Sequence, residues 1–158
     1  MMIKEKEMTT FDFKDGNGPV PAHEHPNGGG WVADTAKVVE TAYVGPDARV
    51  YGNARVSDNA QVYCNAKVLD NAIVSDNAQV FGDAEVFGKA EVYGNAKVYG
   101  KAQVFGYAEV YGNALVYGKA QVFGNAEVYG KTEVYGKSWV SGYAQVYGKA
   151  RVLSLIHI

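Results

Sequence analysis

The chain of 158 residues is long enough for one domain of ordinary size. Its 15 Lys and Arg residues nearly balance its 17 Asp and Glu residues, so the charge gives no broad attraction for nucleic acid or an anionic membrane. A single cysteine excludes an internal disulfide, and no apolar run reaches the ~20 residues of a membrane span. The charged start also lacks the apolar core of a signal peptide, so we expect a cytoplasmic protein without nucleic-acid or membrane partners.

Residues 1–30 differ in composition from the rest and are expected to form an irregular N-terminal arm or cap. Residues 11–21 are loop-like, and a turn-rich Pro-Asn-Gly-Gly-Gly segment leads into Trp31. We expect Phe11, Phe13 and Trp31 to close the apolar end of the structure that follows. A tether or an interaction arm is the alternative role.

A six-residue repeat begins at Val32, and valine recurs at every sixth position up to Val152, 21 times without exception. The position two residues before the valine is alanine in 18 of 20 repeats, the exceptions being Thr132 and Ser138. The position two residues after the valine is glycine from Gly82 to position 148. The unit is therefore Ala-x-Val-(Tyr/Phe)-Gly-(Asn/Lys).

Each unit indicates one short strand followed by one corner. Alternation along a strand puts Ala and Val on one face and the variable residue and the aromatic residue on the other. Glycine supplies the positive φ of a sharp corner, and Asp or Asn tolerates that conformation better than most residues. A period of six does not fit the turn of an α-helix. Short strands at this fixed period predict a parallel β-helix with Val and Ala inside.

The number of sides follows from the aromatic residues after the valines. Three repeats make an 18-residue coil, and every eighteenth residue then keeps its type. The resulting columns are Phe87, Phe105 and Phe123; Tyr93, Tyr111, Tyr129 and Tyr147; and Tyr63, Phe81, Tyr99, Tyr117 and Tyr135. A coil with two or four sides would mix the Phe and Tyr columns. We therefore predict a three-sided prism of about seven coils over residues 31–152.

The uninterrupted Val-x-x-x-Ala-x pattern resembles the hexapeptide-repeat superfamily of left-handed β-helices, many of whose members are acyltransferases. The resemblance covers Val32 to Val152. It implies a single-stranded, three-sided, left-handed parallel β-helix. The chain departs from the usual pattern because it places an aromatic residue after the valine and moves glycine one position later.

Acyltransferases of that superfamily use a histidine as general base, usually in a cleft between subunits. This chain has three histidines, His23, His25 and His157, and none lies within residues 31–152. The resemblance therefore implies a fold without supplying an active site. We assign no catalytic, cofactor-binding or metal-binding residue from the sequence, and we expect no cofactor.

The last six residues, 153–158, read Leu-Ser-Leu-Ile-His-Ile and break the repeat. Read back into the codons CTG-TCT-CTT-ATA-CAC-ATC, this peptide resembles the transposase end sequence used in DNA library preparation. We therefore expect residues 153–158 to be a sequencing-adaptor scar on a truncated C-terminus. The alternative is a native apolar cap, because Ile158 keeps the six-residue phase.

The segment His23-Glu24-His25 is one candidate metal site. It could offer two imidazoles and a carboxylate, and on an extended segment the two rings would lie on one side. Zinc normally needs a third strong ligand, so a polar loop is the favoured interpretation.

Corner residues give two further candidates. Asp58-Asn59 and Asp76-Asn77 lie 18 residues apart and should stack at one corner, where oxygen ligands could hold calcium. Ordinary corner chemistry is the favoured explanation. Cys64 occupies a glycine position and is expected to be an exposed thiol at a corner.

The outward aromatic columns are the most informative surface feature. Their rings should stack as ladders, and they also offer apolar surface to a partner, such as a second and third copy in a trimer, or to a carbohydrate. The column Glu91, Glu109 and Glu127 places like charges one coil apart, and Lys89 and Lys131 are expected to offset them.

Three functions remain open. The favoured one is a non-catalytic structural or binding module, acting as a rigid spacer or an association surface. The first alternative is an acyltransferase-like enzyme whose active-site residues lie outside the repeats or beyond the truncation, for example at His23–His25. The second is glycan binding on the aromatic ladders.

Overall fold

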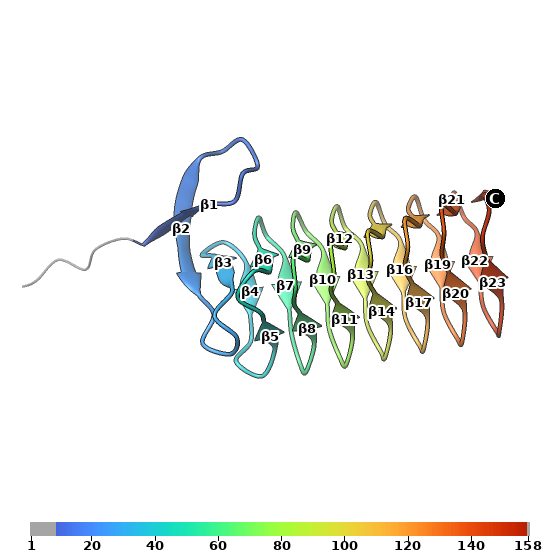
Figure 1. Cartoon of the computed structure of the whole chain (residues 1–158), viewed down its shortest axis with the longest axis horizontal. Coiled ribbons are helices and arrows are strands. Elements are labelled where there is room, and N and C mark those ends of the chain that lie inside the picture. Colours follow the sequence, from blue (N-terminus) through green and yellow to red (C-terminus); the bar gives the residue numbers. More distant parts are fainter. Residues whose placement is uncertain (1–8, 158) are drawn as a thin grey trace, which may run out of the picture.

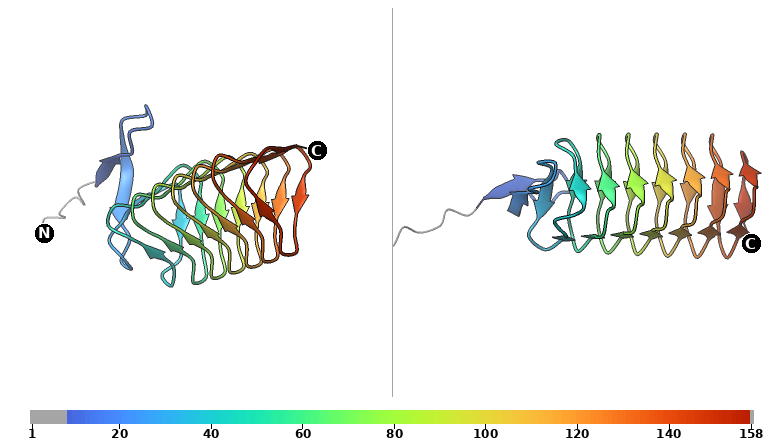
Figure 2. Two further views of the ribbon diagram at one scale, coloured as in Figure 1. Left: turned by 45° about the vertical axis from the view of Figure 1, so that its right-hand side comes forward. Right: turned by 90° about the horizontal axis from the view of Figure 1, so that it is seen from below.

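The computed structural model describes residues 9–157, which form a rod of three parallel sheets preceded by an antiparallel cap (Figures 1 and 2). Successive strands belong to successive sheets, so the chain winds around a central axis. The predicted fold class is confirmed: the chain is an all-β, three-sided parallel solenoid of about seven 18-residue turns. Among the described residues, no helix is long and apolar enough to span a membrane.

Sheet 1 has ten strands. In spatial order they are β1 (Thr10–Asp12), β2 (Pro19–Glu24), β3 (Trp31–Ala33), β6 (Arg49–Val50), β9 (Lys67–Val68), β12 (Glu85–Val86), β15 (Gln103–Val104), β18 (Gln121–Val122), β21 (Trp139–Ser141) and β24 (Ile156–His157).

Sheets 2 and 3 have seven strands each. Sheet 2 consists of β4 (Lys37–Val38), β7 (Arg55–Val56), β10 (Ile73–Val74), β13 (Glu91–Val92), β16 (Glu109–Val110), β19 (Glu127–Val128) and β22 (Gln145–Val146). Sheet 3 consists of β5 (Tyr43–Val44), β8 (Gln61–Val62), β11 (Gln79–Val80), β14 (Lys97–Val98), β17 (Leu115–Val116), β20 (Glu133–Val134) and β23 (Arg151–Val152).

The register between coils is 18 residues, as the columns predict. Val92 lies opposite Val110, and Val110 lies opposite Val128, in parallel pairing. The backbone bonds extend beyond the two-residue strands: the Tyr93 N–H donates to the Val110 carbonyl at 3.0 Å, and the Asn95 N–H donates to the Gly112 carbonyl at 2.8 Å. Each coil is therefore hydrogen-bonded to the next along its sides and at its corners.

The interior holds the valine and alanine columns in a single apolar cluster that runs from Val32 to Val152. Nearly all of these side chains are fully buried, with Val38 and Ala150 only partly so. Each buried valine contributes on the order of 1.5–3 kcal/mol before chain entropy is subtracted. The same two side chains recur in every coil, so the interior has one solution repeated along the rod.

The corners are tight because their residues have positive φ. Gly118 has φ +69, and a Cβ placed there would lie 2.9 Å from the backbone nitrogen of Gly136 in the next coil. Four corners in the first half use other residues in the same conformation, namely Asp58, Cys64, Asp70 and Asp76, with φ between 56 and 58. Cys64 is exposed at such a corner, as predicted.

The N-terminal cap is more regular than predicted. Residues 11–21, expected to be loop-like, contribute to the antiparallel strands β1 and β2. β2 also pairs with β3 through residues 22–24, so it covers the free edge of sheet 1. Pro19 and Pro21 suggested a loop because proline donates no hydrogen bond, but they lie in the half of β2 that pairs with β1 alone.

The aromatic residues of the cap do not close the valine column, so that prediction was wrong. Phe13 is buried in a second cluster on the outer surface of sheet 1, with Phe11 and Trp31 packed against it. The Phe11 ring stacks on Trp31 at 4.8 Å, and the Phe13 ring stacks on Tyr51 at 4.8 Å. The physical reason is the alternation itself: Trp31 immediately precedes the inward Val32, so it must point outward.

A different segment, residues 25–30, covers the first edge of sheet 3. The Val44 N–H donates to the Asn27 carbonyl, and the Gly30 N–H donates to the Val44 carbonyl, both at 3.0 Å. A Cβ at Gly28 would lie 2.2 Å from the Val44 oxygen, so only glycine permits this approach. The turn-rich segment is therefore a fitted edge cover.

At the other end the six-residue phase is lost after Val152. β24 pairs with β21 so that Ile156 lies opposite Val140, an offset of 16 residues in place of 18. Ile158, on which the alternative of a native cap rested, lies outside the described residues. The adaptor interpretation of residues 153–158 stays a prediction.

Candidate functional site

The two histidines of the cap have separate partners. His23 lies on β2, and its Nδ1 is 2.7 Å from Oδ1 of Asp34, with both side chains about half exposed. His25 is only 3% exposed, and its Nε2 is 2.8 Å from the Ala42 carbonyl oxygen. A carbonyl oxygen only accepts hydrogen bonds, so Nε2 of His25 carries a proton.

The His23-Glu24-His25 segment thus does not present both rings on one side, contrary to expectation. His25 serves the edge cover, where the Asn27 side-chain amide also donates to the Ala42 carbonyl at 3.1 Å. His23 remains at the surface, held by Asp34. The two imidazoles are therefore not assembled as a pair of metal ligands.

The stacked Asp corners have a structural use. Asp58 Oδ2 accepts a hydrogen bond from the Asp76 backbone N–H at 3.2 Å, and Asp76 Oδ2 accepts one from the Gly94 N–H at 3.0 Å. Each carboxylate thereby binds the corner amide of the next coil. Such a bond offsets part of the strain of positive φ at a residue with a Cβ. The predicted stacking is present, and one carboxylate oxygen of each pair is already engaged with the backbone.

The aromatic columns form ladders, as predicted. Phe87 stacks on Phe105, and Tyr93 on Tyr111, with ring centroids 4.8 Å apart and planes within 3° of parallel. The third column, from Tyr63 to Tyr135, stacks in the same way, at 4.8 to 5.4 Å. Inside a ladder each ring therefore covers the faces of its neighbours and leaves mainly its edge toward solvent.

The acidic column lies beside the tyrosine ladder on sheet 2. Glu91, Glu109 and Glu127 face one another in register. Partial burial, together with the Glu127 and Glu91 carboxylates, raises the pKa of Glu109 above its usual value. Burial and the same carboxylates raise the pKa of Tyr93 to about 12.

The predicted compensation by Lys89 and Lys131 is absent. Within residues 9–157 neither lysine forms an ion pair with the acidic column. Lys89 lies at a corner, and its Nζ is 5.4 Å from the centre of the Tyr107 ring. The corner directs this side chain along its own edge of the prism, away from the face that carries the glutamates.

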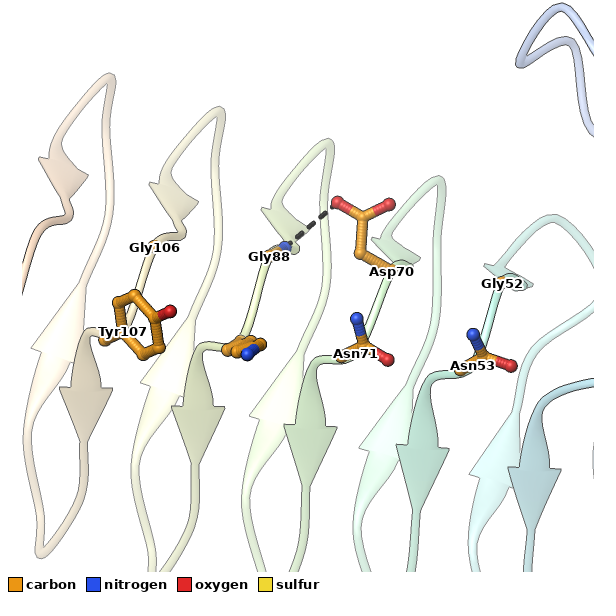
Figure 3. A pocket seen from close by; sticks show the side chains of 8 residues that line it. Gly52, Asn53, Asp70, Asn71, Gly88, Gly106 and Tyr107 are labelled. Atoms are coloured by element: carbon orange, nitrogen blue, oxygen red, sulfur yellow. Dashed lines mark hydrogen bonds between the residues drawn. The ribbon is translucent and has the colours of Figure 1, made fainter.

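That edge, between sheets 1 and 2, contains a shallow groove of about 470 Å³ (Figure 3). One corner from each of four successive coils contributes two residues to it. The lining residues are Gly52, Asn53, Asp70, Asn71, Gly88, Lys89, Gly106 and Tyr107. We call this feature the corner groove. Figure 3 shows Asn53, Asn71 and Tyr107 in a row along it, with Asp70 reaching to the next coil.

The sequence analysis missed the corner groove because it followed the columns of outward residues on the faces. Reading every eighteenth residue at the position after the glycine gives Asn53, Asn71, Lys89, Tyr107, Asn125 and Tyr143. The corresponding column at the edge between sheets 3 and 1 ends in Lys101, Lys119 and Lys137. The column at position six of each repeat was therefore the available signal.

Comparisons with known proteins agree with this architecture. Two segments, residues 48–63 and 108–122, match the family model described as YdcK beta solenoid repeat. Neither the curated proteins nor the solved structures gave a significant match. Membership in the hexapeptide-repeat acyltransferases stays a prediction. The three-sided coil and the matched segments together identify the chain as a β-solenoid repeat protein.

Proposed function

We propose that the chain is a non-catalytic structural module, a stiff rod that keeps its ends and faces at fixed separations. The continuous Val/Ala interior carries this proposal, because it joins all coils from Val32 to Val152 into one apolar cluster. A solenoid with one such core has no internal boundary at which it would bend. The proposal leaves the faces free to associate with a partner, including further copies of the chain.

The outer surface supports the same role. Stacked aromatic pairs contribute roughly 0.5–1.5 kcal/mol each beyond their buried area. Ladders run on all three sheets, with Phe105 on sheet 1, Tyr111 on sheet 2 and Tyr99 on sheet 3 among their members. Because ladders link coil to coil on every side, they resist bending in every direction.

Spin-label distances test stiffness directly. Asp47, Lys101 and Lys137 are exposed and occupy one edge at the same position of their coils. Labels would be placed at Asp47→Cys with Lys101→Cys, and at Asp47→Cys with Lys137→Cys, in a Cys64→Gly background. At ~4.8 Å per coil, the second pair should be separated by about 10 Å more than the first.

A rod predicts two narrow distance distributions that differ by this amount. Broad distributions, or a shorter separation for the more distant pair, would refute the stiff-module proposal. A matched pair at the cap, Asp15→Cys with Asp47→Cys, reports on the labels where the chain is not part of the coils.

A second candidate, acyl transfer, is favoured by one specific observation. His23 is held by Asp34 through Nδ1, which leaves Nε2 for a proton transfer of the kind that a general base performs. Incubation with an acyl thioester would test this role. Turnover that disappears in His23→Ala and persists in His157→Ala would favour the enzyme and overturn the non-catalytic proposal.

A further inference from the structure

We propose that the corner groove binds a neutral saccharide chain, lying along the edge between sheets 1 and 2. This inference adds a ligand to the rod and does not depend on its stiffness. Within the part of the chain that the structure describes, the groove combines unused hydrogen-bonding groups with an aromatic side chain that belongs to no ladder.

The hydrogen-bonding groups face the same space. Asn53 and Asn71 are exposed, and within residues 9–157 their side-chain amides have no hydrogen-bond partner. Asp70 uses Oδ2 to accept from the Gly88 N–H at 3.1 Å, which leaves Oδ1 available. Carboxamides and a carboxylate supply both donors and acceptors, the combination that sugar hydroxyls require.

Two backbone amides add to this set. The N–H groups of Asp70 and Gly106 have no acceptor among the described residues. A side-chain carbon at Gly52 would lie 2.9 Å from the Asp70 nitrogen, and one at Gly88 would lie 2.9 Å from the Gly106 nitrogen. The glycines therefore leave these amides open to a ligand in the groove.

Tyr107 supplies the stacking surface. Its side chain is 60% exposed, and no other ring stacks on it among residues 9–157. The Lys89 ammonium lies 5.4 Å from the ring centre, at a distance at which a sugar ring can displace it and bind it through a hydroxyl. The ladder tyrosines lack this freedom because their faces are covered by neighbouring rings.

Charge and spacing indicate the class of ligand. Asp70 and Lys89 are the only ionised residues that line the groove, and their charges cancel. A neutral polyhydroxylated ligand suits this balance better than a polyanion does. Each coil contributes one side chain of the row, and a pyranose unit in an extended chain advances by roughly the spacing of adjacent strands, ~4.8 Å.

The test is a titration of the whole chain with cellohexaose, maltohexaose and chitohexaose, followed by amide NMR. We expect at least one of them, at millimolar concentration, to shift the amide resonances of Asp70 and Gly106. Tyr107→Ala should weaken that binding by about tenfold or more. Tyr143→Ala is the matched control, because Tyr143 is 74% exposed in the same column but does not line the groove.

A second pair of variants separates hydrogen bonding from stacking. Asn71→Ala should weaken binding, whereas Asn125→Ala, in the same column outside the groove, should not. All four residues are exposed, so their replacement leaves the core intact. The proposal is overturned if none of the three saccharides shifts these amides. It is also overturned if Tyr107→Ala and Tyr143→Ala bind equally, or if the shifts map to the ladders.

Discussion

The first three coils, residues 31–81, and the later coils, residues 82–152, share one interior and differ on the outside. Ala54 and Ala108 belong to the same inward column, and both are fully buried. At the corners, however, the first region uses Asp70 and Asp76, and the second uses glycine alone. The fold thus requires small residues inside and positive φ at the corners, but it accepts two chemical solutions for the latter.

The two solutions have opposite merits. An aspartate corner bears the strain of positive φ and in return binds the amide of the next coil, as Asp76 does for Gly94. A glycine corner has no strain but leaves the next amide, such as that of Gly106, without an acceptor among the described residues. Because the interior is common to both regions, substitutions inside should act alike in both, and substitutions at corners should not.

The largest effect is expected from overpacking the interior. Ala108→Leu should lower the free energy of unfolding by about 3 kcal/mol, because the alanine is fully buried between coils. Ala54→Leu should lose a similar amount, since it lies three coils earlier in the same column. Gln121→Leu, at an outward position where Leu115 occurs naturally, is the control. Chemical denaturation measures all three, and a tolerant Ala54→Leu would break the claim of a common interior.

Corner substitution should be next. Gly118→Ala places a Cβ 2.9 Å from the Gly136 nitrogen at φ +69, and we expect a loss of about 2 kcal/mol. Gly148→Ala has φ +76 but nothing within 4 Å of the added carbon, so only the strain of about 1 kcal/mol remains. Thermal unfolding of the two variants compares them. Equal losses would show that contact between coils does not limit the corner.

A gain is expected at Thr132, one of the two exceptions in the alanine column. Its hydroxyl is buried and has no hydrogen-bond partner among residues 9–157. Thr132→Ala should raise the free energy of unfolding by about 1 kcal/mol, because an unsatisfied polar group is removed. The reciprocal change Ala114→Thr, one coil earlier in the same column, should lower it. A destabilised Thr132→Ala would indicate that the hydroxyl is satisfied.

The smallest effect concerns the acidic column of the later coils. The pKa of Glu109 is raised in the folded chain, so folding favours its protonated form. Its contribution is therefore favourable below the unfolded pKa of about 4.5 and is lost as the pH rises through the folded pKa. Glu109→Gln should gain about 0.5 kcal/mol at neutral pH and flatten this dependence.

Denaturation midpoints measured across pH 4 to 7, on the order of the Glu range, would show the change. Glu133→Gln is the control, because Glu133 pairs with Arg151 at 3.4 Å and should gain nothing. If both variants behaved alike, the like charges of the column would not be what raises the pKa of Glu109.

The sequence predicted the coils well because each inward residue sees the same surroundings in every turn. The valine at Val92, for example, has a valine above and below it, so period alone determines its environment. The cap has no such redundancy. The contacts of Phe13 with Tyr51, and of His25 with the Ala42 carbonyl, join residues without a shared period. The corner groove was missed for a third reason, because its residues repeat in position but not in type.

The measurement that tests the central claim most directly is the stability of two deletion variants. Removing residues 100–117 takes out one 18-residue coil and joins Tyr99 to Gly118 in phase. Removing residues 100–116 takes out one residue fewer and turns every later valine outward. Interchangeable coils predict cooperative unfolding with native-like circular dichroism for the first variant and loss of the folded state for the second. Equal stability of the two variants would contradict the 18-residue coil.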